Sequence, residues 1–327
     1  MIFVGVDWAE NSHSICVMDD GGEVISRRSV PDNPQGLTWL HTAIEGLATQ
    51  ADNVFIAVES DHGLFVDSLI AAGYQVYAVN PLSVSRYRDR HSTSRQKSDP
   101  GDAKLLADLV RTDRHNHRLA VKDSETIESL RVVTRAHKQL IQERIRLSNR
   151  LRNTLHDYYP AAILAFSDFD APDVLELLHA APTPLRGRKL SLSKIAAALR
   201  RAHRHNVDER AAEIQRALRS TQLERGMVVN DAYDLTAQAT IDILQAINRQ
   251  IGALEAQIAE LYETHPEAEL YNSLPGLGKV LGPRILSGFG DVPERYTDSK
   301  SRKCVSGMAP VTRASGQGLV RPPSRRH

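Results

Sequence analysis

The chain begins with short runs of apolar and β-branched residues that are separated by polar or glycine-containing turns. The runs are Ile2–Trp8, His13–Asp19 and Glu23–Ser29. Strands joined by connections this short pair as antiparallel neighbours. The pattern predicts a three-stranded antiparallel meander.

Helices and strands alternate in the next part of the chain. Leu37, Leu40, Ile44 and Leu47 recur at helical spacing, and an apolar strand, a second helix and another apolar run follow at Val54–Val58, Leu64–Ala72 and Gln75–Val79. A meander followed by this alternation, with right-handed crossovers, is the topology of the ribonuclease H fold. We therefore predict a ribonuclease-H-like α/β domain over residues 1–115.

After Pro81, basic and helix-forming residues replace the strands, and the rest of the chain is predicted to be all-α. Asp102–Arg111 is a helix candidate, and Ser124–Leu155 is a long one. His137 and Arg144 fall where the apolar stripe of the long helix needs apolar residues. The stripe of this helix is therefore imperfect.

The clearest helical stripe alternates three- and four-residue steps, as a coiled-coil seam does: Leu244, Ile247, Ile251, Leu254, Ile258 and Leu261. A helix that buries this stripe needs a partner, which is either Ser124–Leu155 or another subunit. Shorter helices are expected over Asp168–Arg225. These segments predict a helical, coiled-coil region over residues 116–265.

Two glycines between short helices are typical of a helix-hairpin-helix, and they occur here in Leu274-Pro275-Gly276-Leu277-Gly278. Bare backbone N–H groups in such a turn can approach a phosphate closely. Gly276, Gly278 and Lys279 are therefore candidate nucleic-acid-binding residues. They lie in a small helical C-terminal domain that we predict over residues 266–327.

Charge matters through local clustering, because the formal net charge is only +1. Residues 86–152 contain seventeen Lys or Arg against nine Asp or Glu, and residues 295–327 contain eight against one. Such clusters attract a phosphate backbone. A solvated helix surface is the alternative. The candidate contacts in the first cluster are Arg86, Arg88, Arg90, Arg95 and Lys97.

Cysteine usage and hydropathy narrow the class of protein. Two cysteines without CxxC spacing indicate neither a disulfide framework nor a zinc site. No apolar run approaches the roughly 18 residues needed to span a bilayer, and the N-terminus lacks the pattern of a signal peptide. We expect a soluble, cytoplasmic protein without a membrane partner.

Acidic residues are expected to meet at the centre of the predicted sheet. Asp7 lies near the end of the first strand and Glu59 just past the fourth, and these strands are neighbours in the fold. Asp99 and Asp102 share one face at the start of a helix. Clustered carboxylates repel each other unless a cation lies among them, and all-oxygen ligation selects Mg²⁺ or Mn²⁺. Alternatively, Asp99 is a helix cap with Pro100 at the first helical position.

Several blocks match a known family in content, order and spacing. They are Val4-Gly5-Val6-Asp7, Ala57-Val58-Glu59-Ser60, Val79-Asn80-Pro81, Lys97-Ser98-Asp99-Pro100-Gly101-Asp102-Ala103, Leu274–Gly278 and Gly307–Gly316. In these blocks the chain resembles the DEDD transposases of insertion-sequence family 110, whose N-terminal domain is similar to the RuvC resolvase. The resemblance covers nearly the whole chain.

The resemblance implies an RNA-guided DNA transposase or recombinase. The family's four acids correspond to Asp7, Glu59, Asp99 and Asp102, which would hold Mg²⁺, and its nucleophilic serine corresponds to Ser315. It further implies a covalent phosphoserine link to DNA and a structured guide RNA that pairs with donor and target DNA. Recombination between two DNA partners needs several active sites, so we expect a dimer or tetramer formed through the helical seam. Without the resemblance, Ser315 is typical of a plain Ser-Gly turn.

The chain ends twelve residues after Ser315, whereas members of the family continue with a basic helical tail. We therefore expect a truncation or frameshift, which would affect activity. Three other functions stay open: a RuvC-like metal-dependent nuclease or resolvase without serine chemistry, a sugar-kinase or actin-like ATPase, and an inactive remnant that only binds nucleic acid. The ATPase is disfavoured because Trp8-Ala9-Glu10-Asn11 is a poor phosphate cradle.

Overall fold

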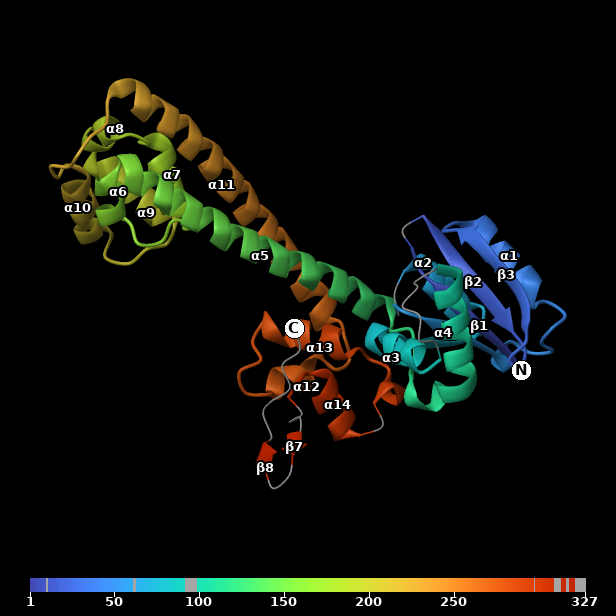
Figure 1. Cartoon of the computed structure of the whole chain (residues 1–327). Helices are drawn as coiled ribbons and strands as arrows, with labels where there is room; N and C mark the ends of the chain where they lie inside the picture. Colours follow the sequence, from blue (N-terminus) through green and yellow to red (C-terminus); the bar gives the residue numbers. More distant parts are fainter. Residues whose placement is uncertain are drawn as a thin grey trace. The chain divides into compact units, whose positions relative to one another are not determined.

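A computed structural model describes residues 1–9, 11–60, 63–91, 99–296, 298–308, 313–315 and 318–320. The chain forms two compact units, both drawn in Figure 1. We call Met1–Asp123 together with Val292–His327 the sheet unit, and Ser124–Asp291 the helical unit. None of the described helices is long and apolar enough to cross a membrane.

A mixed sheet forms the centre of the sheet unit (Figure 1). Its strands are β1 (Ile2–Asp7), β2 (Ser12–Met18), β3 (Val24–Pro31), β4 (Val54–Val58), β5 (Gln75–Ala78) and β6 (Arg118–Leu119). Their order is β3-β2-β1-β4-β5-β6, in which β1, β4 and β5 are parallel and the other pairings are antiparallel. The predicted meander and the order βββαβαβ are confirmed. The sequence did not predict β6, because two residues are too few to show a period.

Helices cover both faces of this sheet. The side chains of each strand alternate between the faces, so both faces present apolar residues against which helices pack. The helical segments of this part are α1 (Pro34–Ile44), η1 (Ala51–Asn53), α2 (Leu64–Ala71), α3 (Pro81–His91), α4 (Asp99–Asp113) and η2 (Arg114–Asn116). Val4, Val6 and Ile56 belong to the core under α1 and α2. Phe3 and Ala57 belong to the core under α3 and α4. An α/β domain is thus confirmed, and α3 is a helix that the sequence analysis did not delimit.

Two long helices, α5 (Glu125–Tyr158) and α11 (Met227–Glu263), lie side by side along the helical unit (Figure 1). Ser124 caps α5, because its hydroxyl oxygen accepts a hydrogen bond from the backbone N–H of Ile127 at 3.2 Å. The other helices are α6 (Pro160–Ala165), α7 (Pro172–Ala180), α8 (Pro184–Arg188), α9 (Leu192–Arg201), α10 (Val207–Leu218), α12 (Ala268–Ser273) and α13 (Leu281–Phe289).

The predicted coiled-coil seam of α11 packs against α5 of the same chain. Leu244 shares a buried cluster with Leu151, and Ile258 shares another with Ile127 and Leu130. Of the two partners that the sequence left open, the structure therefore places the Ser124–Leu155 helix against the seam.

His137 and Arg144, which interrupt the apolar stripe of α5, each meet polar partners from other elements. The Nε2 atom of His137 lies 3.2 Å from a carboxylate oxygen of Glu255, and its Nδ1 atom lies 3.0 Å from a guanidinium nitrogen of Arg284. Arg144 forms an ion pair with Asp170 at 2.9 Å. The interruptions are therefore partly buried polar contacts with other elements of the chain, which an apolar stripe does not reveal.

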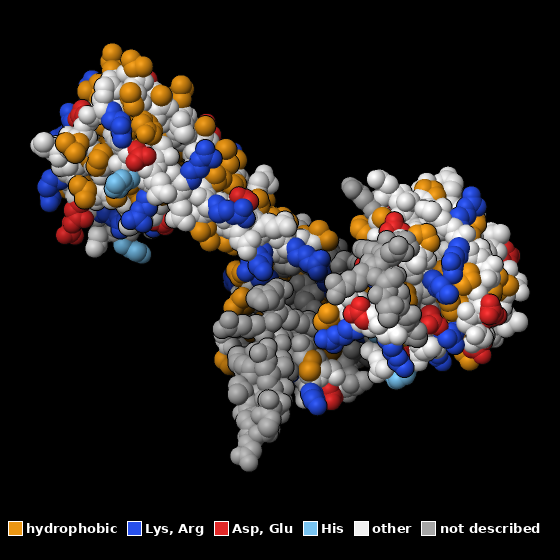
Figure 2. Space-filling view, viewed as in Figure 1, with side chains coloured by type: hydrophobic (Ala, Val, Ile, Leu, Met, Phe, Trp, Pro, Cys, Tyr) orange, Lys and Arg blue, Asp and Glu red, His pale blue; other side chains and the backbone are white. Residues whose placement is uncertain are grey.

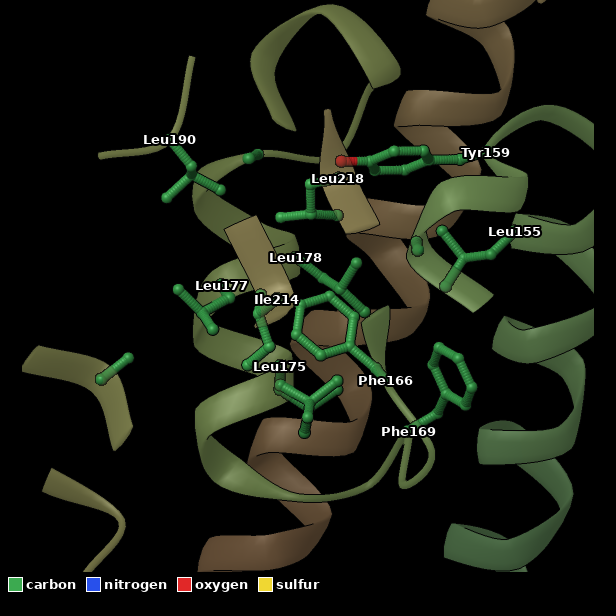
Figure 3. Packing of buried hydrophobic residues seen from close by; sticks show 14 of the residues in the cluster. Leu155, Tyr159, Phe166, Phe169, Leu175, Leu177, Leu178, Leu190, Ile214 and Leu218 are labelled. Carbon is green, nitrogen blue, oxygen red and sulfur yellow. The ribbon is translucent and has the colours of Figure 1, made fainter. Parts of the chain in front are cut away.

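The shorter helices surround a core of aromatic and aliphatic side chains (Figure 3). Figure 3 shows Phe166 and Phe169 close to Leu175, Leu178 and Ile214. These residues come from α7, α10 and the loop between α6 and α7. The predicted group of short helices thus forms one folded body around the end of α5.

The C-terminal part contains strands as well as helices. The segment from Val292 contains η3 (Pro293–Arg295), α14 (Ser299–Val305) and a hairpin of β7 (Arg313–Ser315) with β8 (Gly318–Val320). Arg295 forms a buried ion pair with Asp123 at 2.7 Å, which attaches this segment to the end of the first one. The functional regions 1–115, 116–265 and 266–327 remain a prediction, because compact units and functional regions need not coincide.

Candidate active site

β1 and β4 end side by side, and a candidate acid stands at the end of each strand. Val6 pairs with Val58 in parallel register. Asp7 and Glu59 are therefore the next positions on neighbouring strands. Alternation along the strands assigns both positions to the face that α4 covers. Asp7 is partly buried and Glu59 is exposed.

Gly5 allows α4 to lie directly on β1. A Cβ atom at this position would come within 1.9 Å of the carbonyl oxygen of Ala103 and within 2.5 Å of the amide nitrogen of Ala107. No larger residue fits such a backbone approach without displacing the helix. Gly5 thus sets the distance between the strand that ends in Asp7 and the helix that contains Asp102.

The N-terminus of α4 points to the edge of the sheet where β1 and β4 end. Arg114, directly after α4, lies 5.9 Å from the ring centre of Phe3 and 4.7 Å from that of Phe55, near the beginnings of the two strands. Ala103, near the start of α4, lies against Gly5 further along β1. The helix therefore runs antiparallel to β1. Three stretches that are separated in sequence therefore meet at one edge of the sheet. They are the end of β1 at Asp7, the position after β4 at Glu59 and the first turn of α4 at Asp99–Asp102.

Asp99 and Asp102 lie in the first turn of α4. The helix begins at Asp99, whose side chain is exposed, whereas Asp102 is only 3% exposed. Carboxylates in a first turn interact favourably with the helix dipole. Residue 98 lies outside the described residues, so the alternative of Asp99 as a cap stays open.

A positive side chain contacts the buried acid of this group. The Nη2 atom of Arg88, on α3, donates a hydrogen bond to Oδ1 of Asp102 at 2.5 Å. Tyr87 fixes α3 to α4, because its hydroxyl donates to Oδ2 of Asp108 at 2.8 Å. Burial raises the pKa of the Tyr87 hydroxyl, which keeps it protonated as a donor.

The sequence did not predict this ion pair. Val84 and Tyr87 are buried on α3, and their spacing would have placed Arg88 at the border of the same helix face. In the described part of the chain, no three His, Cys, Asp or Glu side chains are gathered closely enough to hold a metal ion. The backbones of β1, β4 and α4 thus converge at one edge of the sheet, but the side chain of Asp102 contacts Arg88.

The other predicted basic contacts differ in their surroundings. Arg86 and Arg90 are exposed on α3, as a backbone-binding side chain requires. Arg95 and Lys97 lie outside the described residues.

Ser315 is the last residue of β7, and it pairs with Gly318 of β8. Its side chain is outside the part of the chain that the structure describes. The contact between Ser315 and the acids therefore stays a prediction.

The predicted helix-hairpin-helix corresponds to α12, a turn and α13. Gly276 has a φ of +81°, a backbone conformation that favours glycine. Nothing lies within 4 Å of a Cβ atom built at Gly276 or Gly278, and Lys279 is exposed. The backbone of this turn is therefore open to a ligand.

Comparison with known families identifies the chain. A transposase model of the DEDD type of IS110 matches residues 4–160, and a model described as transposase IS116/IS110/IS902 family matches residues 268–326. The chain belongs to this transposase family. The first match contains the four candidate acids, and the second contains Ser315. The resemblance inferred from the motifs is confirmed.

Relatives of this transposase align along nearly all of its length. A Streptomyces coelicolor protein described as "Mini-circle putative transposase for IS117" is 36% identical over 97% of this chain and 78% of its own length. An uncharacterized 44.8 kDa protein of insertion element IS116 from Streptomyces clavuligerus is 30% identical over 97% of this chain and 78% of its own. An uncharacterized 42 kDa protein of insertion element IS900 from Mycobacterium paratuberculosis is 27% identical over 99% and 81%.

Proposed function

We propose that this transposase cuts and rejoins DNA with a divalent metal, Mg²⁺ or Mn²⁺, held by Asp7, Glu59, Asp99 and Asp102, and with Ser315 as the nucleophile. The observation that supports this proposal most is the meeting of β1, β4 and α4 at one sheet edge. The strand order β3-β2-β1-β4-β5 also supports a ribonuclease-H-like, RuvC-like fold for the domain.

The acidic residues suit such a metal. All their donors are carboxylate oxygens, which Mg²⁺ and Mn²⁺ prefer. Asp102 is almost fully buried, and the cation that a buried carboxylate needs is the guanidinium of Arg88 in the absence of a metal. When bound, the metal polarises the phosphate and stabilises the oxygen that leaves.

Serine chemistry supplies the rejoining step. The Oγ atom of Ser315 would attack phosphorus, forming an ester as the bond to the leaving sugar oxygen breaks. The link between serine and DNA is itself a phosphodiester, so one such bond would form for each one that is cut. A hydroxyl of the second DNA partner can then displace the serine without ATP.

A structured guide RNA and DNA are the proposed partners. Base pairing by the RNA would select donor and target, so the protein needs contacts to backbones more than to bases. Arg86, Arg90 and the open turn at Gly276–Lys279 supply such contacts.

We also propose that several copies act together. Because α5 fills the seam of α11, an oligomer needs another surface. Val228, Leu235 and Ile243 are exposed along one side of α11, and Figure 2 shows hydrophobic side chains at the end of the unit where α11 begins. These residues are the proposed contact between copies.

Covalent capture tests the serine. The full chain is incubated with its RNA, Mn²⁺ and labelled DNA, and a protein–DNA adduct is sought after denaturation. We expect an adduct from the wild type and from Ser306→Ala, an exposed serine of the same segment, but none from Ser315→Ala.

Other results would select the alternative functions. Unchanged cutting by Ser315→Ala, without an adduct from any variant, would indicate a nuclease or resolvase that uses the acids alone. Binding of nucleic acid without any Mn²⁺-dependent cutting would indicate an inactive remnant.

A further inference from the structure

Arg88 occupies the carboxylate where the proposed metal would bind. Its Nη2 atom is 2.5 Å from Oδ1 of Asp102, and a Mg²⁺ ion lies roughly 2 Å from an oxygen that ligates it. A metal on this oxygen and the guanidinium would therefore be only a few ångströms apart. Because like charges repel at such distances, the two cations compete for Asp102.

A second arginine–aspartate pair of the molecule shows what a permanent contact looks like. Arg204 binds Asp173 with two nitrogens, Nε to Oδ2 at 3.1 Å and Nη2 to Oδ1 at 2.8 Å. This parallel arrangement is the strong, geometrically specific form of the pair. Arg88 uses one nitrogen, and its buried Nε atom has no hydrogen-bond partner among the described residues. The contact of Arg88 is therefore the easier one to exchange.

The surroundings of Arg88 offer it a second position. Its side chain is 22% exposed, whereas that of Asp102 is 4% exposed. Arg86 and Arg90 lie on the same helix and are exposed, so a phosphate backbone bound along α3 would come within reach of Arg88. Leaving Asp102 thus requires a change of side-chain conformation and no movement of the fold.

We propose that Arg88 is an exchangeable counter-ion of the metal site. It neutralises Asp102 in the metal-free protein, and it turns to a nucleic-acid phosphate when the metal takes its place. Metal and nucleic acid then favour each other's binding, because each removes a competitor of the other. This inference rests on the proposed metal site, and it adds that Arg88 and nucleic acid control when the metal binds there.

Binding of Mn²⁺ to the full chain without nucleic acid tests the proposal, measured by the loss of the paramagnetic resonance signal of free Mn²⁺. Removing a charge-assisted hydrogen bond that competes with the metal should strengthen binding about tenfold. We expect this gain for Arg88→Gln, and none for Lys104→Gln, which removes an exposed charge from α4, the helix that contains Asp102. In the double variant Arg88→Gln with Asp102→Asn the gain should disappear. Circular dichroism checks that each variant is folded.

The possible failures are distinguishable. Equal Mn²⁺ affinity of the wild type and Arg88→Gln, with weaker binding in Asp102→Asn, overturns the role of Arg88 and leaves the metal site standing. Weaker binding by a folded Arg88→Gln also overturns it, since Arg88 would then support the site. No binding by any variant overturns the metal site and this proposal together. If Arg88→Gln does not fold, Arg88→Lys replaces it, with a smaller gain expected because the shorter ammonium cannot keep the same contact.

Discussion

One buried aspartate in the helical unit and one in the sheet unit are each paired with an arginine, but in different geometries. In the helical unit, Asp173 receives two nitrogens of Arg204, and both ring nitrogens of His137 have a partner. In the sheet unit, Asp102 faces a single nitrogen of Arg88. Burial and residue type are alike in the two cases. The completeness of the partner set separates a charge that stabilises the fold from one that is available for chemistry.

His137 shows how far the partner set determines a structural group. A guanidinium has no acceptor, so Nδ1 of His137 must accept the hydrogen bond from Arg284. The ring proton is therefore on Nε2, which donates to Glu255. Each ring nitrogen of His137 therefore has a partner of the matching hydrogen-bonding type.

The largest expected effect is the loss of DNA cutting in Asp102→Asn. Under the proposed function, removing this carboxylate from the metal site should lower the rate about a thousandfold, because the charge that develops on phosphate would lose its stabilisation. Asp102 is buried about as deeply as Asp173, so the substitution also costs stability, and cutting is compared under conditions where circular dichroism shows that the variant is folded. Full cutting by Asp102→Asn would show that Asp102, like Asp173, is a charge that serves only the fold.

For Asp173→Asn we expect a loss of stability without a loss of cutting by the folded protein. Asp173 is 2% exposed in its pair with Arg204, and breaking a buried pair costs about 3 kcal/mol, to be measured by urea unfolding. Glu176→Gln is the matched control, because Glu176 pairs with Arg201 in an exposed position, and its loss should change the free energy of unfolding little. Equal losses in the two variants would show that completeness of pairing in the helical unit does not matter.

Gly5→Ala tests how the sheet edge is positioned. The new methyl group would collide with the backbone of Ala103, which should cost about 2 kcal/mol and weaken Mn²⁺ binding as α4 moves from β1. Gly252→Ala, in the middle of α11 with nothing within 4 Å of the new Cβ, should instead stabilise the protein by about 1 kcal/mol. A destabilised Gly5→Ala with unchanged Mn²⁺ affinity would separate packing from metal binding.

Much of the sheet unit could be predicted from the sequence because its signals are local. Short runs of apolar and β-branched residues marked β1 to β5, and the positions of Asp7 and Glu59 at strand ends followed from strand order. The approach of Asp102 to that edge depends on the close contact of Gly5 with α4. The family motif contains Gly5, but the pattern of apolar and polar residues did not show why a glycine is needed there.

What could not be predicted depends on contacts distant in sequence. The stripe of α11 showed that a partner existed but not that α5 was the partner. His137 and Arg144 looked like defects because their partners come from distant parts of the chain. Arg88 was predicted to be a nucleic-acid contact, but in the structure it pairs with Asp102. Charge clustering alone does not distinguish a phosphate contact from an internal counter-ion.

His137→Ala should have a moderate effect. It leaves the guanidinium of Arg284 and the carboxylate of Glu255 without the ring between them, which should cost about 1.5 kcal/mol in urea unfolding. His137→Gln retains a donor and an acceptor, so it should recover part of this loss. No difference between the two variants would mean that packing, rather than hydrogen bonding, accounts for the position.

The smallest effect is expected at Asp170, a group of the helical unit whose pairing changes with pH. Burial, together with neighbouring Asp168, raises the pKa of Asp170 to about 6, compared with about 3.9 in an unfolded chain. Between these values the folded protein holds a proton that the unfolded chain has lost. Asp170 therefore stabilises the fold at low pH, and this contribution disappears as the pH rises from about 4 to about 6.

Asp170→Asn removes this titration. Asp168 partly offsets the effect, because its hydrogen bond with Asp170 lowers the pKa of Asp168, and that group stabilises the fold as the pH rises. The melting temperature of Asp170→Asn relative to the wild type should still increase from pH 4 to pH 6, whatever its absolute level after the ion pair with Arg144 is lost. A difference that is flat or falls over this range would show that Asp170 is ionised throughout. The pair with Arg144 would then belong with the complete, permanent contacts of the helical unit, as that of Arg204 does.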